Sequence, residues 1–352
     1  MRYRLAIGAV VLQVLALAFM AGEREWILRT GRTILLRTAP IDPNDPMRGD
    51  YVRLDYEISH VPRNRLAGEL PKHFPPAEDG RRSPERKVYA RLDLGENGIA
   101  ELADLIDTRP DGGIFIRGRA QNSHGRTVQV RYGIEALFME QGSARKLENM
   151  RTSERAGVPL DIEVALSPSG IAVLKDYTWE PLGITLSFER TPAPPRNDGG
   201  ASGTVRPQQL ITSVTVELKN YGTEDLAVVD LPNGGSLRLV PDERWQDARF
   251  RWVGEERASP RPEAGHVFVL KPGEGHKMKI DLTAPAWFVV STAPAGDKTP
   301  VALRDITDAW SASFRIEYAP PPKAGVAGLP HAELIRHGRL RSRAFNPTGS
   351  VD

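Results

Sequence analysis

The sequence predicts a mainly β protein with an N-terminal transmembrane helix, then a β-rich domain (a sheet or barrel with one short helix), and finally an antiparallel β-sandwich. Three observations predict this fold class. Only the N-terminal segment is apolar enough to cross a bilayer. Short stretches of alternating apolar and polar residues recur through the rest of the chain. The 29 prolines and 32 glycines divide the chain into many short elements.

The composition of the 352 residues excludes several classes of function. The 47 Lys and Arg nearly balance the 45 Asp and Glu, so no basic field would attract nucleic acid. The absence of cysteine excludes disulfides, thiolate nucleophiles and zinc–thiolate sites. The 7 histidines form no HExxH motif or other tight ligand pattern. We therefore expect no nucleic-acid partner, no metal site and no cofactor.

The membrane segment runs from Leu5 to Gly22, with Gln13 as its one strongly polar side chain. At about 1.5 Å per residue this run just spans a hydrocarbon core of roughly 30 Å. Arg2 and Arg4 precede it, which predicts a cytoplasmic N-terminus. The expected location is the bacterial cytoplasmic (inner) membrane, crossed once, with the bulk of the chain in the periplasm or outside.

The alternative is a cleaved signal peptide, because Ala16-Leu17-Ala18 has the small-x-small pattern that signal peptidase recognises. The uncleaved anchor is favoured because the apolar run continues past that point. Residues Glu23 to Thr30 then resemble a helical extension that stops at Gly31, a residue common at helix C-termini. Residues 1–30 are therefore assigned to an anchor helix and its extension.

Beyond the anchor, the sequence predicts a β-rich domain over residues 31–180, a second over 181–345 and a flexible tail over 346–352. The first begins with a strand at Thr33 to Ala39. The clearest half-buried strand follows a proline-rich loop, with Val52, Leu54, Tyr56 and Ile58 on its inner face. Further alternation involves Val88, Ala90, Leu92, Leu94, Val128, Val130, Tyr132, Ile134, Leu160, Ile162, Val164 and Leu166. Helical spacing between Gly142 and Gly157 predicts one short amphipathic helix.

A resemblance to a known family rests on several segments in order. The first is Pro40-Ile41-Asp42-Pro43, and Arg48-Gly49-Asp50-Tyr51 follows it. The others are Val130-Arg131-Tyr132-Gly133-Ile134-Glu135 and later acidic residues. Together they resemble the bacterial GDYXXXLXY-motif family, whose members have unknown function, over about residues 31–180. The family name as written here has three residues between the first Tyr and the Leu, whereas this chain has two. A one-residue difference would exchange the two faces of a strand.

The resemblance supplies the candidate binding residues, which are Arg48, Gly49, Asp50, Tyr51, Arg131, Tyr132, Glu135, Glu140 and Glu148. The structural interpretation is favoured for most of them, since Gly and Asp before a strand commonly shape their own turn. If Glu135 is partly buried, we expect Arg131 or Arg48 to pair with it. The resemblance also implies an integral membrane protein as partner.

The second domain shows short strands at the spacing of a sandwich, after a Pro-, Gly- and Ser-rich stretch at Thr191 to Pro207. It resembles an immunoglobulin-like β-sandwich at the level of class. Its tryptophans are expected in the core. Trp245 is the exception, because polar residues surround it, and it is a candidate surface aromatic.

Three functional hypotheses remain open. The first is a non-catalytic protein-interaction or assembly module of the cell envelope. The second is a hydrolase of envelope glycans or peptides that uses carboxylates at Asp50 and Glu135. The third is a carbohydrate-binding sandwich that uses Trp245. No catalytic residue is assigned.

Overall fold

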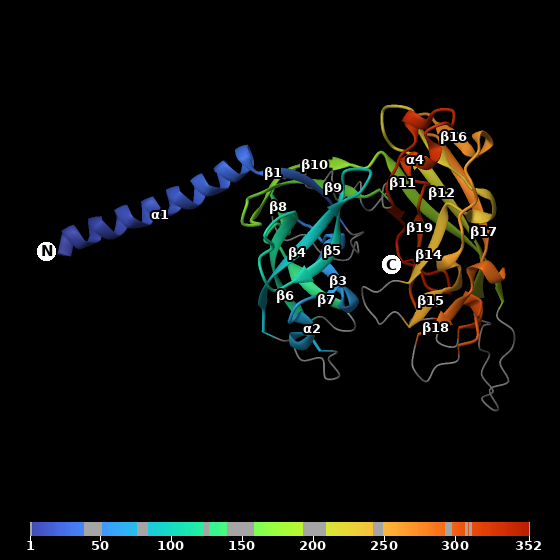
Figure 1. The fold of residues 1–352 in the computed structure, drawn as a ribbon, viewed down its shortest axis with the longest axis horizontal. Helices are drawn as coiled ribbons and strands as arrows, with labels where there is room; N and C mark the ends of the chain where they lie inside the picture. The colour runs from blue at the N-terminus through green and yellow to red at the C-terminus, as the bar shows by residue number, and fades with distance from the viewer. Residues whose placement is uncertain are drawn as a thin grey trace.

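A computed structural model of the chain describes residues 2–38, 51–75, 84–122, 127–138, 158–192, 209–241, 249–292, 298–306, 309 and 312–351. It shows a mainly β protein with one long N-terminal helix, so the predicted fold class is confirmed. Figure 1 shows two strand-rich lobes, with helix α1 (Arg2–Thr30) projecting from the first. The chain passes from the first lobe to the second between Glu180 and Leu182.

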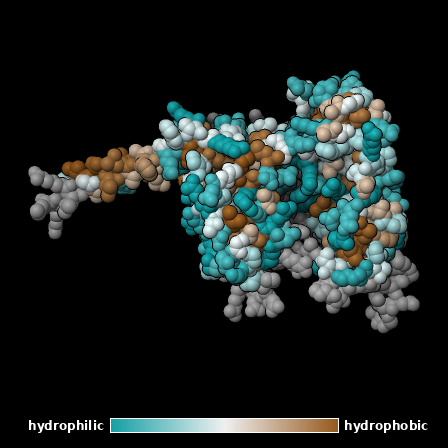
Figure 2. Space-filling model, in the orientation of Figure 1, coloured by the Kyte–Doolittle hydropathy of each residue, from teal (hydrophilic) through white to brown (hydrophobic). Residues whose placement is uncertain are grey.

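Helix α1 is continuous through the apolar run and the predicted extension. Its span from Ile7 to Thr30 is long and apolar enough to cross a membrane by length and composition, and Figure 2 shows its apolar surface. The helix ends where Gly31 N donates to Ile27 O at 2.8 Å. A Cβ at Gly31 would lie 2.5 Å from that oxygen, so only glycine fits. Strand β1 (Arg32–Arg37) follows at once, with no linker.

The first lobe contains strands β1 to β10, all paired antiparallel. They form a five-stranded sheet in the order β3-β7-β6-β4-β5, a three-stranded sheet in the order β1-β9-β10, and the pair β2-β8. After β1 the strands are β2 (Tyr51–Arg53), β3 (His60–Pro62), β4 (Arg86–Leu94), β5 (Ala100–Ile106), β6 (Ile114–Asn122), β7 (Thr127–Arg131), β8 (Ala136–Phe138), β9 (Leu160–Leu166) and β10 (Ala172–Trp179), and the short helix α2 is Leu70–His73.

The alternation expected after the motif is present in the burial of the side chains. Leu54, Tyr56 and Ile58 are buried, whereas Asp55 between the first two is half-buried. The strand itself is shorter than expected, because a 3₁₀ turn, η1 (Glu57–Ser59), replaces it at Ile58. Leu94 is 48% exposed, so its expected inward position is wrong. It is the last residue of β4, beside the turn at Gly95 and beyond the edge of the core.

The second lobe is also built from antiparallel strands. Their orders are β11-β12-β17 and β14-β19-β20, with the pairs β13-β16 and β15-β18. The elements are β11 (Leu182–Pro192), β12 (Gln209–Asn220), β13 (Leu226–Val229), β14 (Leu237–Pro241), β15 (Phe250–Trp252), β16 (Val267–Leu270), β17 (Gly275–Asp281), β18 (Val289–Ser291), β19 (Phe314–Tyr318), helix α4 (Lys323–Val326) and β20 (Leu340–Arg341).

Each lobe has its own hydrophobic core. The first core draws on residues between Ile34 and Trp179, and the main core of the second on residues between Leu182 and Phe345. In the second core Trp252 and Trp287 stack with ring centroids 5.3 Å apart, consistent with the expected core role. Among the described residues, no hydrophobic cluster contains members of both lobes.

The segment from Asn346 to Val351 is not the flexible tail that the sequence predicts. Ile211 N donates to Pro347 O at 3.0 Å, and Arg190 Nη2 donates to Gly349 O at 2.8 Å. Phe345, immediately before it, is fully buried and forms a bridge with Val351. The C-terminal segment therefore packs on β11 and β12. The sequence gives little sign of this, because the segment is polar and carries no alternation.

Candidate functional site

Several predicted site residues lie outside the described part of the chain. These are Arg48, Gly49, Asp50, Glu140, Glu148 and Trp245. The predicted helix between Gly142 and Gly157 also lies outside it. Tyr51 is described through its backbone, which pairs with Phe138 in the β2-β8 ladder. Arg131, Tyr132 and Glu135 are described fully.

Two tyrosines fix the segment after β2 to the segment after β7. Tyr56 Oη donates to Ile134 O at 2.7 Å, and Tyr132 Oη donates to Ile58 O at 2.7 Å. Each hydroxyl therefore reaches the carbonyl two residues beyond the other tyrosine. Both side chains are buried, and burial raises the pKa of each phenol well above its ordinary value, with the charge of Glu135 adding to the effect. Both hydroxyls thus remain protonated donors.

Glu135 closes the turn that this arrangement requires. Its carboxylate accepts hydrogen bonds from Tyr132 N at 2.5 Å and Gly133 N at 3.0 Å. Gly133 has a φ of 82°, which glycine adopts without strain. The Glu135 carbonyl accepts from Leu54 N at 2.8 Å and so extends the β2-β8 pairing. Both the carboxylate and the backbone of Glu135 therefore have structural partners.

Of the two partners predicted for Glu135, Arg131 is not one, and Arg48 lies outside the described residues. Arg131 pairs with Glu85, and its side chain is 57% exposed. Tyr132 and Glu135 are brought together in one turn, whereas Arg131 points away from it along β7. Within the described residues, the candidates from the motif therefore form a structural brace and do not converge on one pocket.

Comparison with known proteins identifies this part of the chain. Residues 13–176 match the family model described as GDYXXLXY protein. Over these residues the chain is similar to the GDYXXLXY family. No curated protein and no solved structure matches the chain significantly.

The family motif has two residues between its first Tyr and its Leu, and Gly49-Asp50-Tyr51-Val52-Arg53-Leu54-Asp55-Tyr56 fits it at every position. The difference of one residue noted above therefore lay in the longer spelling of the motif and not in this chain. The final Tyr of the motif is Tyr56. With Tyr132 it makes the pair of side-chain hydrogen bonds that we call the tyrosine brace. Leu54 and Tyr56 both face the core of the first lobe, which we call the GDYXXLXY lobe.

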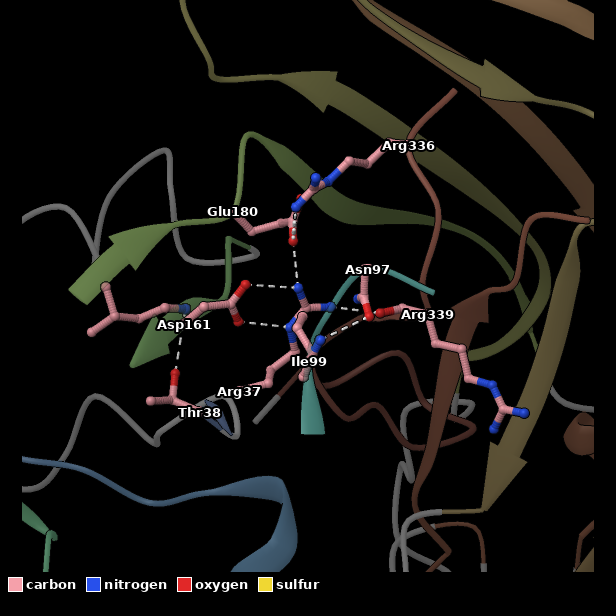
Figure 3. A network of polar contacts seen from close by, with 9 residues as sticks. Arg37, Thr38, Asn97, Ile99, Asp161, Glu180, Arg336 and Arg339 are labelled. Carbon is pink, nitrogen blue, oxygen red and sulfur yellow. Dashed lines mark hydrogen bonds and ion pairs between the residues drawn. The ribbon is translucent and has the colours of Figure 1, made fainter. Parts of the chain in front are cut away.

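The second candidate site is a buried ion network where the two lobes meet (Figure 3). Arg37, the last residue of β1, binds Asp161 through two hydrogen bonds of 2.9 and 3.0 Å. Its Nη2 also donates to Glu180, and its Nη1 donates to Arg339 O of the second lobe at 2.6 Å. Arg336 of the second lobe donates to Glu180 at 2.5 and 3.0 Å. The charges alternate from Asp161 to Arg37, Glu180 and Arg336.

The network is charged although most of it is buried. Arg37, Asp161 and Glu180 are each at most 6% exposed. Burial by itself lowers the pKa of Arg37, but the hydrogen bond and charge of Asp161 and the charge of Glu180 raise it above its ordinary value. Burial raises the pKa of Asp161, and Arg37 opposes that rise. The two-point contact with the guanidinium is the geometry that favours the ionised form of this carboxylate against its burial.

A further set of charges lies along the boundary between the two lobes, which we call the seam. Glu317 on β19 is 2% exposed and accepts from Arg341 Nε at 2.8 Å. Burial lowers the pKa of Arg341, but the charges of Glu57, Glu317 and Glu101 outweigh this and raise it. Glu57 and Glu101 belong to the GDYXXLXY lobe, so their charges act across the seam. Figure 2 shows hydrophilic residues edging the hollow between the lobes.

The β4–β5 hairpin turn of the GDYXXLXY lobe reaches the second lobe. Glu96 accepts a hydrogen bond from Lys323 N at 2.9 Å. Its carboxylate also lies 3.8 Å from Nδ1 of His337, whose side chain is 8% exposed. That nitrogen is buried and has no hydrogen-bond partner in the described chain. Burial lowers the pKa of His337, with a smaller opposing effect from Glu96.

The sequence analysis did not identify any residue of the ion network. Arg37 does carry a local signal, because it directly follows the consecutive apolar residues Leu35 and Leu36, whereas Asp161 lies in an alternating stretch and carries none. Such a charge needs a partner if the strand is buried on both faces. Arg336 and Glu180 carry no comparable signal and are 156 residues apart.

The tyrosine brace predicts a loss of stability in hydroxyl-deletion variants. Tyr56→Phe or Tyr132→Phe should lower the free energy of unfolding by about 1–2 kcal/mol, because a buried carbonyl loses its donor. Urea unfolding of the full chain in detergent, followed by tryptophan fluorescence, measures this. Tyr89→Phe is the matched control, since Tyr89 is buried and its hydroxyl makes no hydrogen bond within the described residues. Equal losses in all three variants would contradict the brace.

The ion network predicts a large effect from removing its central charge. Arg37→Met should lower the free energy of unfolding by about 3 kcal/mol or more, since Asp161 and Glu180 lose their common partner. The same urea titration measures it. Arg91→Met removes an arginine from the exposed pair with Asp104 and should have a much smaller effect. If the two substitutions destabilise the protein equally, the network does not hold the lobes together.

His337 predicts a dependence of stability on pH. Because its pKa is lowered in the folded state, the unfolded chain binds this proton more readily. The free energy of unfolding should therefore fall as the pH drops below the unfolded value of about 6.5. The difference in urea midpoint between pH 7.5 and 5.5 should be smaller in His337→Gln, with His73→Gln as control. If His337→Gln shows the same difference in urea midpoint between the two pH values as the wild type, this assignment is refuted.

Proposed function

We propose that the chain is a membrane-anchored, non-catalytic protein-interaction or assembly module of the bacterial cell envelope. Its partner is an integral membrane protein beside the anchor. The bulk of the chain lies on the outer side of the cytoplasmic membrane, with the N-terminus inside. The division into domains of residues 31–180 and 181–345 is part of this proposal.

The observation that carries the proposal is the direct connection between α1 and the GDYXXLXY lobe. Ile27 is 4% exposed and packs on Ala165 of β9 and Val173 of β10. The apolar run ends at Gly22, only five residues or about 8 Å of helix before Ile27. The lobe is therefore fixed close to the surface of any membrane that α1 crosses. This placement suits contact with the outer part of a neighbouring membrane protein.

The charges around the anchor support its orientation. Arg2 and Arg4 precede the apolar run, and the positive-inside rule places such residues in the cytoplasm. Trp26, near the other end, is 69% exposed, and exposed tryptophans are common at the membrane–water interface. These features also favour an anchor over a cleaved signal peptide, because α1 continues past Ala18 and is packed on the lobe at Ile27.

The contacts of Glu135 support a non-catalytic role for the motif. A general acid or a nucleophile needs a carboxylate that can reach a substrate. The Glu135 carboxylate instead accepts from two backbone N–H groups of its own turn. The hydrolase hypothesis also requires Asp50, and the carbohydrate hypothesis requires Trp245, and both lie outside the described residues. No observation favours either over the interaction module.

The proposal predicts that the full chain, tagged at its C-terminus, recovers an integral membrane protein from cross-linked and detergent-solubilised membranes. A matched chain with residues 1–22 replaced by an unrelated membrane span should recover the same protein if the outer lobes make the contact. A chain with only the native span, fused to an unrelated domain, should not. If the intact chain recovers no membrane protein, the proposal fails.

A further inference from the structure

The turn of the β4–β5 hairpin separates two pockets at the seam. The larger has a volume of about 500 Å³ and the smaller about 410 Å³. Glu96 and Asn97 of the turn line both. Asn97 is set directly against Gly338, where a Cβ would lie 2.1 Å from its Nδ2. The two pockets are therefore adjacent, and both require the lobes to be in contact.

The larger pocket is lined by three arginines from separate segments of the second lobe. Arg238 is on β14, Arg261 lies in the loop before β16, and Arg339 precedes β20. Within the described chain, the side chains of Arg238 and Arg261 make no hydrogen bond or ion pair, and both residues are exposed. Arg339 is 3.8 Å from Glu317. Two of the three guanidinium groups therefore have all their donors available.

Three carboxylates lie near these arginines. Glu317 is bound to Arg341. Glu96 accepts from the uncharged Lys323 N, and the charge of Glu101 acts on Arg341. With three arginines against Glu96 and Glu101 in its lining, the pocket, which we call the arginine pocket, keeps an excess of positive charge and the donors of Arg238 and Arg261 for an incoming group. Guanidinium groups bind carboxylates through paired N–H donors.

Prolines make the walls of the arginine pocket rigid. The ring of proline fixes φ, so a loop rich in proline loses little conformational entropy when a ligand binds. Two of its loops are of this kind, and the residues concerned are Pro260, Pro262, Pro320, Pro321 and Pro322. The pocket is therefore already formed before binding.

The smaller pocket has a mixed lining. Its apolar residues come from α4 and the segment after it, namely Val326, Ala327, Ala332 and Ile335. Its polar and charged residues are Glu96, Asn97, Lys323, Glu333, Arg336 and His337. Val326 and Ile335 are nearly fully buried in a small hydrophobic cluster of the second lobe, so Ala327 and Ala332 offer most of the contact for a short aliphatic side chain.

We propose that the seam binds an extended acidic–aliphatic segment of the partner protein. A carboxylate side chain of that segment binds Arg238 and Arg261, and an aliphatic side chain a few residues away occupies the smaller pocket across the hairpin turn. This inference rests on the proposed function, because it names the recognition site of the interaction module. It needs both lobes, since Glu96 and Asn97 complete both pockets.

The test measures binding of a fluorescein-labelled, amidated peptide by fluorescence anisotropy. The peptide has two aspartates followed by two leucines between glycines, and the protein is the full chain in detergent at low salt. Arg238→Gln/Arg261→Gln should weaken binding by about tenfold or more, as loss of charge-assisted hydrogen bonds predicts. Peptides with asparagines for aspartates, or serines for leucines, should also bind more weakly.

The matched control is Arg119→Gln/Arg251→Gln, which removes the same charge at two exposed arginines outside the pockets. Its affinity should stay within about twofold of wild type. The inference is overturned if this control loses as much affinity, if the asparagine peptide binds equally well, or if binding does not saturate. Recovery of a membrane partner together with any of these results would refute the pocket assignment and leave the proposed function standing.

Discussion

The guanidinium of Arg37 is the contact on which the arrangement of the two lobes depends. It binds Asp161 within the GDYXXLXY lobe, Glu180 at the crossing point and the Arg339 carbonyl of the second lobe. No described hydrophobic cluster spans both lobes, so ion pairs and hydrogen bonds provide much of the described contact between them. Buried charges tolerate few geometries, because each needs its partners at hydrogen-bond distance. The seam therefore specifies one relative orientation better than an apolar contact would.

The sequence predicted side-chain burial best in strands that have one face buried and the other exposed to solvent. The alternation at Leu54 and Tyr56, and again at Val128 and Val130, predicted their burial correctly. It was less informative for β9, where Asp161 and Ala165 are buried as well as the alternating residues. In that strand a charged residue looks like a solvent-facing position unless its partner is known. The sequence of β9 alternates with period two although most of its other face is also covered, so the pattern identified the strand but understated its burial.

The candidate site was less predictable than the fold. The turn from Tyr132 to Glu135 was singled out by the motif, but its role as a brace depends on Tyr56, which lies 78 residues from its acceptor, Ile134. The ion network joins Arg37 to residues 124 and 143 positions away, and no local pattern specifies such pairs. The arginine pocket combines arginines from three second-lobe segments with a hairpin of the other lobe. Only tertiary structure brings these groups together.

The anchor and the seam share the same strands. Ile27 of α1 packs on β9 and β10, β9 carries Asp161, and Glu180 follows the last residue of β10. Arg336 and the Arg339 carbonyl are bound to this same pair of strands through Glu180 and Arg37. A continuous path of packed side chains and ion pairs thus connects the membrane helix to the second lobe. Because Gly31 leaves no flexible linker in that path, the direction of α1 sets the direction in which the seam and its pockets face.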